Sequence, residues 1–143
     1  MTDIVITAGS VVPSATATIA RGTSGATVNA GQPVYQDTNN KMQLTNANNV
    51  GHPEQAAGVG LAVNTAASGQ PIEYVTGGDV AMTTTPALVP GKVYVLGTGI
   101  GGLSLSADLD AASPSTRYGS VIGVATTTTN LRIGIVNSGV LRT

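Results

Sequence analysis

The residue types and spacing of the segment from Gly97 to Gly102 match those of a known ligand-binding loop. It reads Gly-Thr-Gly-Ile-Gly-Gly, satisfies the G-x-G-x-x-G pattern of dinucleotide-binding loops, and follows an apolar run at 93–96. That pattern works when a helix begins within the loop and its N-terminal amides face the pyrophosphate. Here the next residues, Leu103 to Ser106, alternate as a strand does, and no acidic residue follows about 20 positions later to hold a ribose. The sequence therefore predicts a glycine-rich β-hairpin loop and no cofactor.

Asp108 and Asp110 have the spacing of ligands in a cation-binding loop. An EF-hand loop also needs a glycine at its sixth position and a glutamate at its twelfth, and neither follows here. His52 is the only histidine and the chain has no cysteine, so the residues that usually bind zinc are not present in sufficient number. We expect a solvated loop at 108–110 and no metal site.

His52 and Glu54 are the one pair that could exchange a proton with a substrate. Their proximity within the polar loop 48–54 is typical of an incidental pair. Serine and threonine are abundant, but no G-x-S-x-G elbow is present to identify a nucleophile. A glycosidase needs two opposed carboxylates, and most of the seven carboxylates lie in predicted turns. We therefore expect no catalytic residue and no enzyme.

Composition narrows the class of protein further. The chain has 143 residues, the length of one ordinary domain, with six basic and seven acidic residues and a formal net charge of −1. A protein that binds nucleic acid or an acidic membrane needs a surplus of basic residues, and this chain has none, so we expect neither as a partner. Only 9% of the residues are charged, against about 25% in a typical soluble domain. Much of the surface is therefore rich in hydroxyl and amide groups or is buried against partners.

Large aromatic side chains are almost absent. Phe, Trp and Cys do not occur, and four tyrosines are the only aromatic residues. Aliphatic side chains must build the core, and small domains with limited burial are marginal alone, so part of the apolar burial is expected between subunits. The same shortage of aromatic residues weighs against a carbohydrate-binding module.

The N-terminus lacks the basic and apolar regions of a Sec-type signal, so we expect synthesis in the cytoplasm and solubility until assembly.

Apolar residues recur with a period of two along most of the chain, which is typical of half-buried antiparallel strands. The alternation covers segments 4–6, 15–19, 59–63, 72–74, 103–106 and 131–135. Clusters of Gly, Pro, Asn and Ser predict turns at 37–40, 67–71, 76–79 and 90–91. We predict an all-β fold, a compact barrel or sandwich of short antiparallel strands. The best helix candidate, Leu105 to Ala112, is at most a single turn.

The chain also resembles itself with a period of about 60 residues. Gly31–Tyr35 aligns with Gly91–Tyr94 when one residue is dropped, which makes Tyr35 and Tyr94 equivalent and favours packing roles for both. The pattern predicts one β domain at 31–143 built from two pseudo-repeats, 31–80 and 91–140, by duplication. Chance recurrence of Gly-x-Val patterns is the alternative. Residues 1–30 lie outside the repeat, either as an arm that packs on a neighbour or as the first strands of the same domain.

Four segments carry a resemblance to a known family. They are Arg-Gly-Thr-Ser-Gly-Ala-Thr-Val-Asn-Ala-Gly-Gln-Pro-Val-Tyr at 21–35, Ala-Gly-Val-Gly-Leu-Ala at 57–62, Ser-Gly-Gln-Pro-Ile at 68–72, and Ile-Gly-Ile-Val-Asn-Ser-Gly-Val at 133–140. Over roughly residues 20–140 the chain resembles the capsid cement or head decoration proteins of tailed bacteriophages. The resemblance implies a compact β fold without catalytic residues, and oligomers, commonly trimers and sometimes dimers, that contact the major capsid protein on the capsid exterior.

The leading hypothesis is thus a virion protein that stabilises a phage head by bridging capsid subunits, with a homotrimer favoured over a dimer. A strand edge is a ready template for pairing with another chain, so Asp3, Ile4, Val5, Ile6 and Thr7 form the candidate capsid or subunit interface. A tail-tube, baseplate or fibre component is the first alternative. A carbohydrate-binding or hydrolytic β domain is the second.

Overall fold

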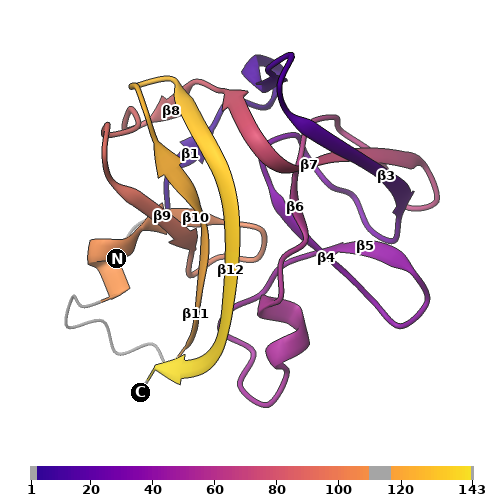
Figure 1. The fold of residues 1–143 in the computed structure, drawn as a ribbon. Coiled ribbons are helices and arrows are strands. Elements are labelled where there is room, and N and C mark those ends of the chain that lie inside the picture. The colour runs from indigo at the N-terminus through magenta and orange to yellow at the C-terminus, as the bar shows by residue number, and fades with distance from the viewer. Residues whose placement is uncertain (1–2, 110–116, 143) are drawn as a thin grey trace.

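The computed structural model describes residues 3–109 and 117–142, and its regular secondary structure is almost entirely β-strand (Figure 1). The strands are β1 (Val5–Ile6), β2 (Val12–Pro13), β3 (Thr18–Ser24), β4 (Pro33–Gln36), β5 (Lys41–Leu44), β6 (Gly60–Ala62), β7 (Pro71–Ala81), β8 (Thr84–Thr85), β9 (Val93–Leu96), β10 (Leu103–Leu105), β11 (Arg117–Ala125) and β12 (Asn130–Arg142). Short 3-10 turns are η1 (Ala8–Ser10), η2 (Pro53–Ala56) and η3 (Ser106–Leu109). The all-β class predicted from the sequence is confirmed.

Five strands close on themselves and form the first lobe, which lies to the right in Figure 1. The ring runs β7–β3–β5–β4–β6 and returns to β7. Its pairings are antiparallel except for β3 with β5, which are parallel. The smaller of two apolar clusters belongs to this ring: Val28, Val34, Met42, Ala62, Ala66, Ile72 and Tyr74.

The second lobe is a sheet in the order β10–β9–β11–β12–β7. Its long β11–β12 hairpin carries Ile122, Leu131 and Ile133 into the larger apolar cluster. Leu61 of β6 joins the same cluster, while its neighbour Ala62 faces the smaller one. Since side chains alternate across a strand, β6 is buried on both faces and links the two cores.

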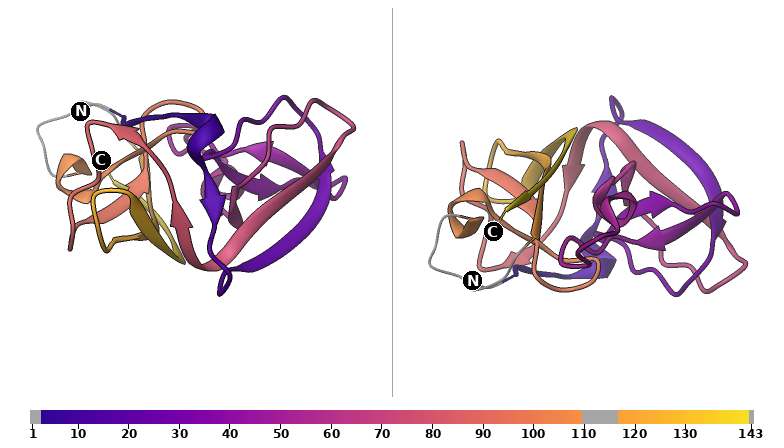
Figure 2. Two further views of the ribbon diagram at one scale, coloured as in Figure 1. Left: turned by 90° about the horizontal axis from the view of Figure 1, so that it is seen from above. Right: turned by 90° about the horizontal axis from the view of Figure 1, so that it is seen from below.

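β7 belongs to both lobes, which lie side by side along it (Figure 2). Its residues 71–77 pair with β3, and its residues 77–81 pair with β12. The turn predicted at 76–79 is therefore wrong. Gly77 and Gly78 bend a continuous strand instead: Gly78 has φ +93°, and a Cβ there would lie 2.7 Å from the Ala17 Cα.

The strand order is the same in both lobes. β5–β4–β6–β7 in the first lobe corresponds to β10–β9–β11–β12 in the second. The turns that open the two units also match. Gly31 (φ +93°) donates its N–H to the Ala62 oxygen at 2.7 Å, and Gly91 (φ +81°) donates to the Ala125 oxygen at 2.8 Å. That the two units arose by duplication stays a prediction.

The strand registers correct one detail of the predicted repeat. Val34 lies opposite Gly60, and Tyr94 lies opposite Gly123, so Val34 and Tyr94 are the equivalent residues. No residue is dropped between the two units at this point. The predicted equivalence of Tyr35 and Tyr94 is therefore wrong. Tyr94 is buried in the larger cluster. Tyr35 follows Val34 in β4, so it faces the opposite side of the strand and is only partly buried.

Two local predictions also differ from the structure. The alternating segment 15–19 becomes a strand only from Thr18, because residues 15 and 16 form a turn. The helical turn considered for Leu105 to Ala112 is a 3-10 turn, η3, over Ser106–Leu109, and residues 110–112 lie outside the described residues.

Candidate functional site

The candidate interface Asp3–Thr7 lies within the second lobe instead of forming a free sheet edge. β1 pairs with β8, placing Val5 opposite Thr85. On the other side, the Ile4 N–H donates to the Leu103 oxygen of β10 at 2.8 Å. The pairing extends one residue beyond β1 and β8, where the Thr7 N–H donates to the Thr83 oxygen at 3.0 Å. The segment thus fills a slot between β8 and β10, so addition to another chain's sheet would require these bonds to break.

Side chains in this segment alternate between the core and the solvent. Ile4 is buried in the larger cluster, and Ile6 packs against it. Val5 points outward and keeps 67% of its surface exposed. The outward face is therefore available for contact with a partner, and whether a capsid or a neighbouring subunit binds it stays a prediction.

The carboxylate of Asp3 is held by the glycine-rich loop between β9 and β10. Its Oδ1 accepts hydrogen bonds from the Thr98 N–H at 2.8 Å and the Thr98 hydroxyl at 3.2 Å, and its Oδ2 accepts one from the Gly99 N–H at 2.8 Å. A Cβ on Gly97 or Gly102 would overlap the carboxylate, and one on Gly99 would lie 2.9 Å from it. The loop is a cradle for this one carboxylate.

This geometry explains the G-x-G-x-x-G pattern without a nucleotide. β9 and β10 are antiparallel neighbours joined by the loop, so the predicted β-hairpin is confirmed and no helix begins there. Sequence reasoning identified the loop but missed Asp3 as its partner. The signal that could have found it is weak, since an acidic residue 95 positions away has no spacing relationship to the loop.

His52 and Glu54 do meet, at the start of η2. The His52 Nδ1 lies 2.8 Å from the Glu54 Oε1, and both side chains are more than half exposed. The backbone N–H of Glu54 and the hydrogen bond from His52 lower the pKa of the Glu54 carboxyl from its ordinary value. An exposed pair with an ionised carboxylate lacks the enclosed environment that tunes a general acid or base.

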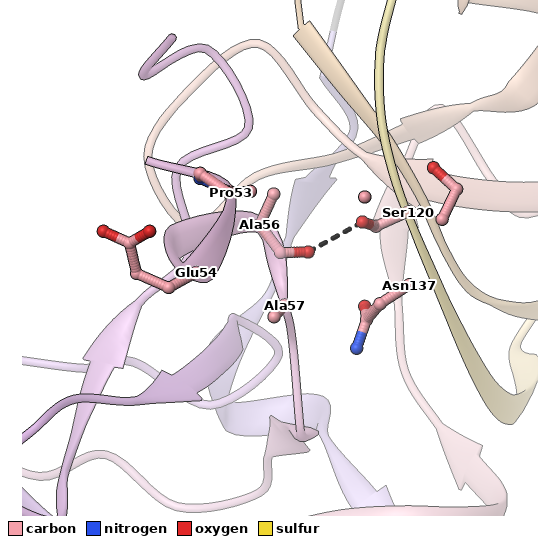
Figure 3. A pocket seen from close by; sticks show the side chains of 8 residues that line it. Pro53, Glu54, Ala56, Ala57, Ser120 and Asn137 are labelled. Carbon is pink, nitrogen blue, oxygen red and sulfur yellow. Dashed lines mark hydrogen bonds between the residues drawn. The ribbon is translucent and has the colours of Figure 1, made fainter. Parts of the chain in front are cut away.

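A pocket of about 300 Å³ lies where η2 faces the β11–β12 hairpin (Figure 3). Its lining residues are Pro53, Glu54, Ala56, Ala57, Ser120, Asn137, Ser138 and Gly139. The Ser120 hydroxyl donates to the Ala56 oxygen at 2.7 Å, and the Asn137 amide donates to the Gly58 oxygen at 3.0 Å. In Figure 3 the Glu54 carboxylate points away from Ser120. The polar groups here join the two lobes to each other.

The remaining candidates bring no further groups together. Asp108 lies in η3, while Asp110 lies outside the described residues. Among residues 3–109 and 117–142, no three His, Asp or Glu side chains cluster as a metal site would require. Within those same ranges, no helix has the length and apolar character to cross a bilayer.

No protein-family model matches the chain, and a search of curated proteins finds no match either. A function therefore has to be inferred from composition, fold and the use that the structure makes of its polar residues.

Proposed function

We propose that the chain is a structural virion protein that decorates the outside of a tailed-phage head. It would stabilise the capsid by bridging major capsid protein subunits, as a homotrimer in preference to a dimer. The protein would be made in the host cytoplasm, join the virion at the capsid exterior, and carry no enzymatic activity. The resemblance of residues 20–140 to head decoration proteins is the starting point of this proposal.

The observation that supports it best is the sharing of β7 between two lobes. A clamp must transmit force between two attachment points, and a continuous strand with a common core joins the lobes more firmly than a linker would. Leu61 and Val75 from the first lobe pack in one cluster with Ile122 and Ile133 from the second. Such a body can hold separate capsid subunits at a fixed spacing.

Exposed apolar side chains on both lobes could be buried in contacts with capsid subunits. Ile19 and Val50 are exposed on the first lobe, and Val5, Val136 and Val140 are exposed on the second by more than 60% each. A standard interface buries about 800 Å² per partner. Several modest contacts made at once give avidity without one strong site.

The direct test mixes purified protein with undecorated expanded heads, sediments the heads and counts the bound copies. We expect saturation at a fixed ratio to capsid subunits and no binding to unexpanded shells. A ratio of one protein chain per capsid subunit around local three-fold axes would agree with a trimer. Absence of binding to both shells would overturn the proposal, and rings or fibres in electron micrographs would then favour a tail component.

Deleting the N-terminal segment would be a poor test of the Asp3–Thr7 interface, because the deletion would also open the second lobe. Val5→Asp is sharper, since this side chain points outward and such surface changes usually alter stability by less than about 0.5 kcal/mol. If the outward face of β1 contacts a partner, Val5→Asp lowers head occupancy several-fold, while the matched Val89→Asp, at an exposed valine outside the contact set, does not. Equal occupancy for Val5→Asp and wild type would remove this face from the interface.

A further inference from the structure

The two lobes differ in one respect that concerns how the chain can associate. In the first lobe, β3 leads to the Gly31 turn and pairs directly with β5. In the second, β8 leads to the equivalent Gly91 turn, but the N-terminal segment, residues 3–13, separates β8 from β10. The second lobe is therefore a sheet with a slot for one added strand.

The slot is built to recognise a particular strand. The Gly97–Gly102 loop binds a carboxylate at one end through the three hydrogen bonds to Asp3. Two inward positions then take the apolar side chains of Ile4 and Ile6. Gly31 leaves room for Ile6, since a Cβ there would lie 2.6 Å from the Ile6 Cγ2. An acidic residue followed by two alternating apolar residues meets these requirements, and the chain's own N-terminus has that sequence.

The segment that fills the slot is hydrogen-bonded through its backbone to the second lobe, and it touches the first lobe where Ile6 packs against Gly31. Its backbone bonds are to β8 and β10 and, through β2, to the end of β7, where Val12 lies opposite Ala81. Only the connection Ser14–Ala17 joins it to β3 of the first lobe. This connection is a tight turn, with the Ala17 N–H donating to the Ser14 oxygen at 3.1 Å and Gly78 packed against it. In Figure 2 the indigo segment lies along the second lobe before the chain crosses to the first.

We propose that the slot between β8 and β10 is a docking site for the N-terminal strand of a second copy of this chain. In the exchanged form, Asp3 of one copy occupies the Gly97–Gly102 loop of its neighbour, and Ile4 and Ile6 complete the neighbour's core. Exchange of an identical element keeps the contacts of the closed form, so its cost is small. The inference is independent of any role on a phage head.

Engineered disulfides test the exchange, because the natural chain has no cysteine. Val5 and Thr85 lie directly opposite each other and both are exposed, and opposed strand residues have the Cα separation that a disulfide accepts. One chain carries Val5→Cys, a second chain of different mass carries Thr85→Cys, and the two are refolded together and oxidised. A matched control mixture uses Val121→Cys and Val136→Cys, which are opposed within the β11–β12 hairpin.

Exchange predicts several-fold more mixed covalent dimer from the Val5→Cys and Thr85→Cys chains than from the control chains. The double variant Val5→Cys/Thr85→Cys should likewise form covalently closed oligomers. A double variant that oxidises only to a monomer, with no excess of mixed dimer, would overturn the proposal. If the double variant does not oxidise, sedimentation of the wild-type chain decides: a monomer at every concentration rules out exchange, and a discrete oligomer that Asp3→Asn weakens supports it.

Discussion

The side chain of Asp3 ties the start of the chain to the second lobe. Its carboxylate accepts three hydrogen bonds from the Gly97–Gly102 loop, two of them from backbone N–H groups. Because hydrogen bonds to a charged group are stronger than neutral ones, this residue contributes more than a typical surface carboxylate.

We expect Asp3→Asn to lower the free energy of unfolding by about 1 to 2 kcal/mol, because the amide nitrogen must face a backbone N–H in place of an acceptor. Urea unfolding followed by circular dichroism measures the change. Glu73→Gln is the control, since the ion pair of Glu73 with Arg21 at 3.5 Å is exposed and should be worth less than about 1 kcal/mol. Equal losses for the two variants would mean that the loop does not hold the carboxylate.

Asp79 makes the junction of β7 and β12 sensitive to acid. Hydrogen bonds from the Asn130 amide and then from Arg132 lower the pKa of its carboxyl below the ordinary value of 3.8. A carboxyl whose pKa is lower in the folded state stabilises the fold above its unfolded pKa, and this stabilisation is lost as pH falls through the folded pKa. Asp79→Asn should therefore reduce the urea midpoint at neutral pH, and the difference from wild type should shrink below about pH 4. A difference that is constant from neutral to acid pH would contradict this account.

At the scale of single residues, sequence and structure agreed where chemistry is local. The hairpin reading of the Gly97–Gly102 loop needed only the strand-like residues that follow it, and the structure has that hairpin. The partner of the loop, Asp3, and the partners of Ser120 and Asn137 are distant in sequence. Hydrogen bonds between distant residues depend on the three-dimensional arrangement of strands, which residue spacing does not encode.

At the scale of elements, Gly60 and Gly123 occupy equivalent positions in the two lobes and have equivalent tight contacts. A Cβ at Gly60 would lie 2.5 Å from a ring carbon of Tyr74, and one at Gly123 would overlap the Arg132 carbonyl. Both sites are where a short or bulged strand passes close to the next strand.

We expect Gly60→Ala and Gly123→Ala each to lower the free energy of unfolding by about 1 to 3 kcal/mol, the usual cost of overpacking. Gly134→Ala is the control, because a Cβ there meets nothing within 4 Å. Thermal or urea unfolding of the three variants measures the difference. If Gly134→Ala were as destabilising as the other two, the close contacts at Gly60 and Gly123 would not be the cause.

Several of the strands were predictable from the sequence, and their partners were only partly so. The alternation of apolar residues identified β1, β6 and β10, together with residues 72–74 of β7 and residues 131–135 of β12. Burial of one face of a sheet imposes this period of two. The turn expected at 76–79 failed because Gly77 and Gly78 also suit a bend within a strand. The parallel pairing of β3 with β5 has no local signature, since it depends on how the ring closes.

At the scale of the whole molecule, the two lobes should unfold together. β7 contributes Ile72 and Tyr74 to the smaller cluster and Val75 and Val80 to the larger one. Neither lobe can lose its strands without exposing apolar surface that belongs to the other. Separate unfolding of one lobe would leave half of β7 without partners, which costs both hydrogen bonds and burial.

Native-state hydrogen exchange can test this coupling at two equivalent amides. The Ala62 N–H donates to the Gln32 oxygen at 2.9 Å in the first lobe, and the Ala125 N–H donates to the Lys92 oxygen at 3.0 Å in the second. If the molecule opens as one unit, both amides report the global free energy of unfolding. Asp3→Asn perturbs only the second lobe directly, yet it should lower the exchange free energies of Ala62 and Ala125 by the same amount. A loss at Ala125 with no change at Ala62 would mean that the second lobe opens alone, and a rigid clamp could not then be formed from these two lobes.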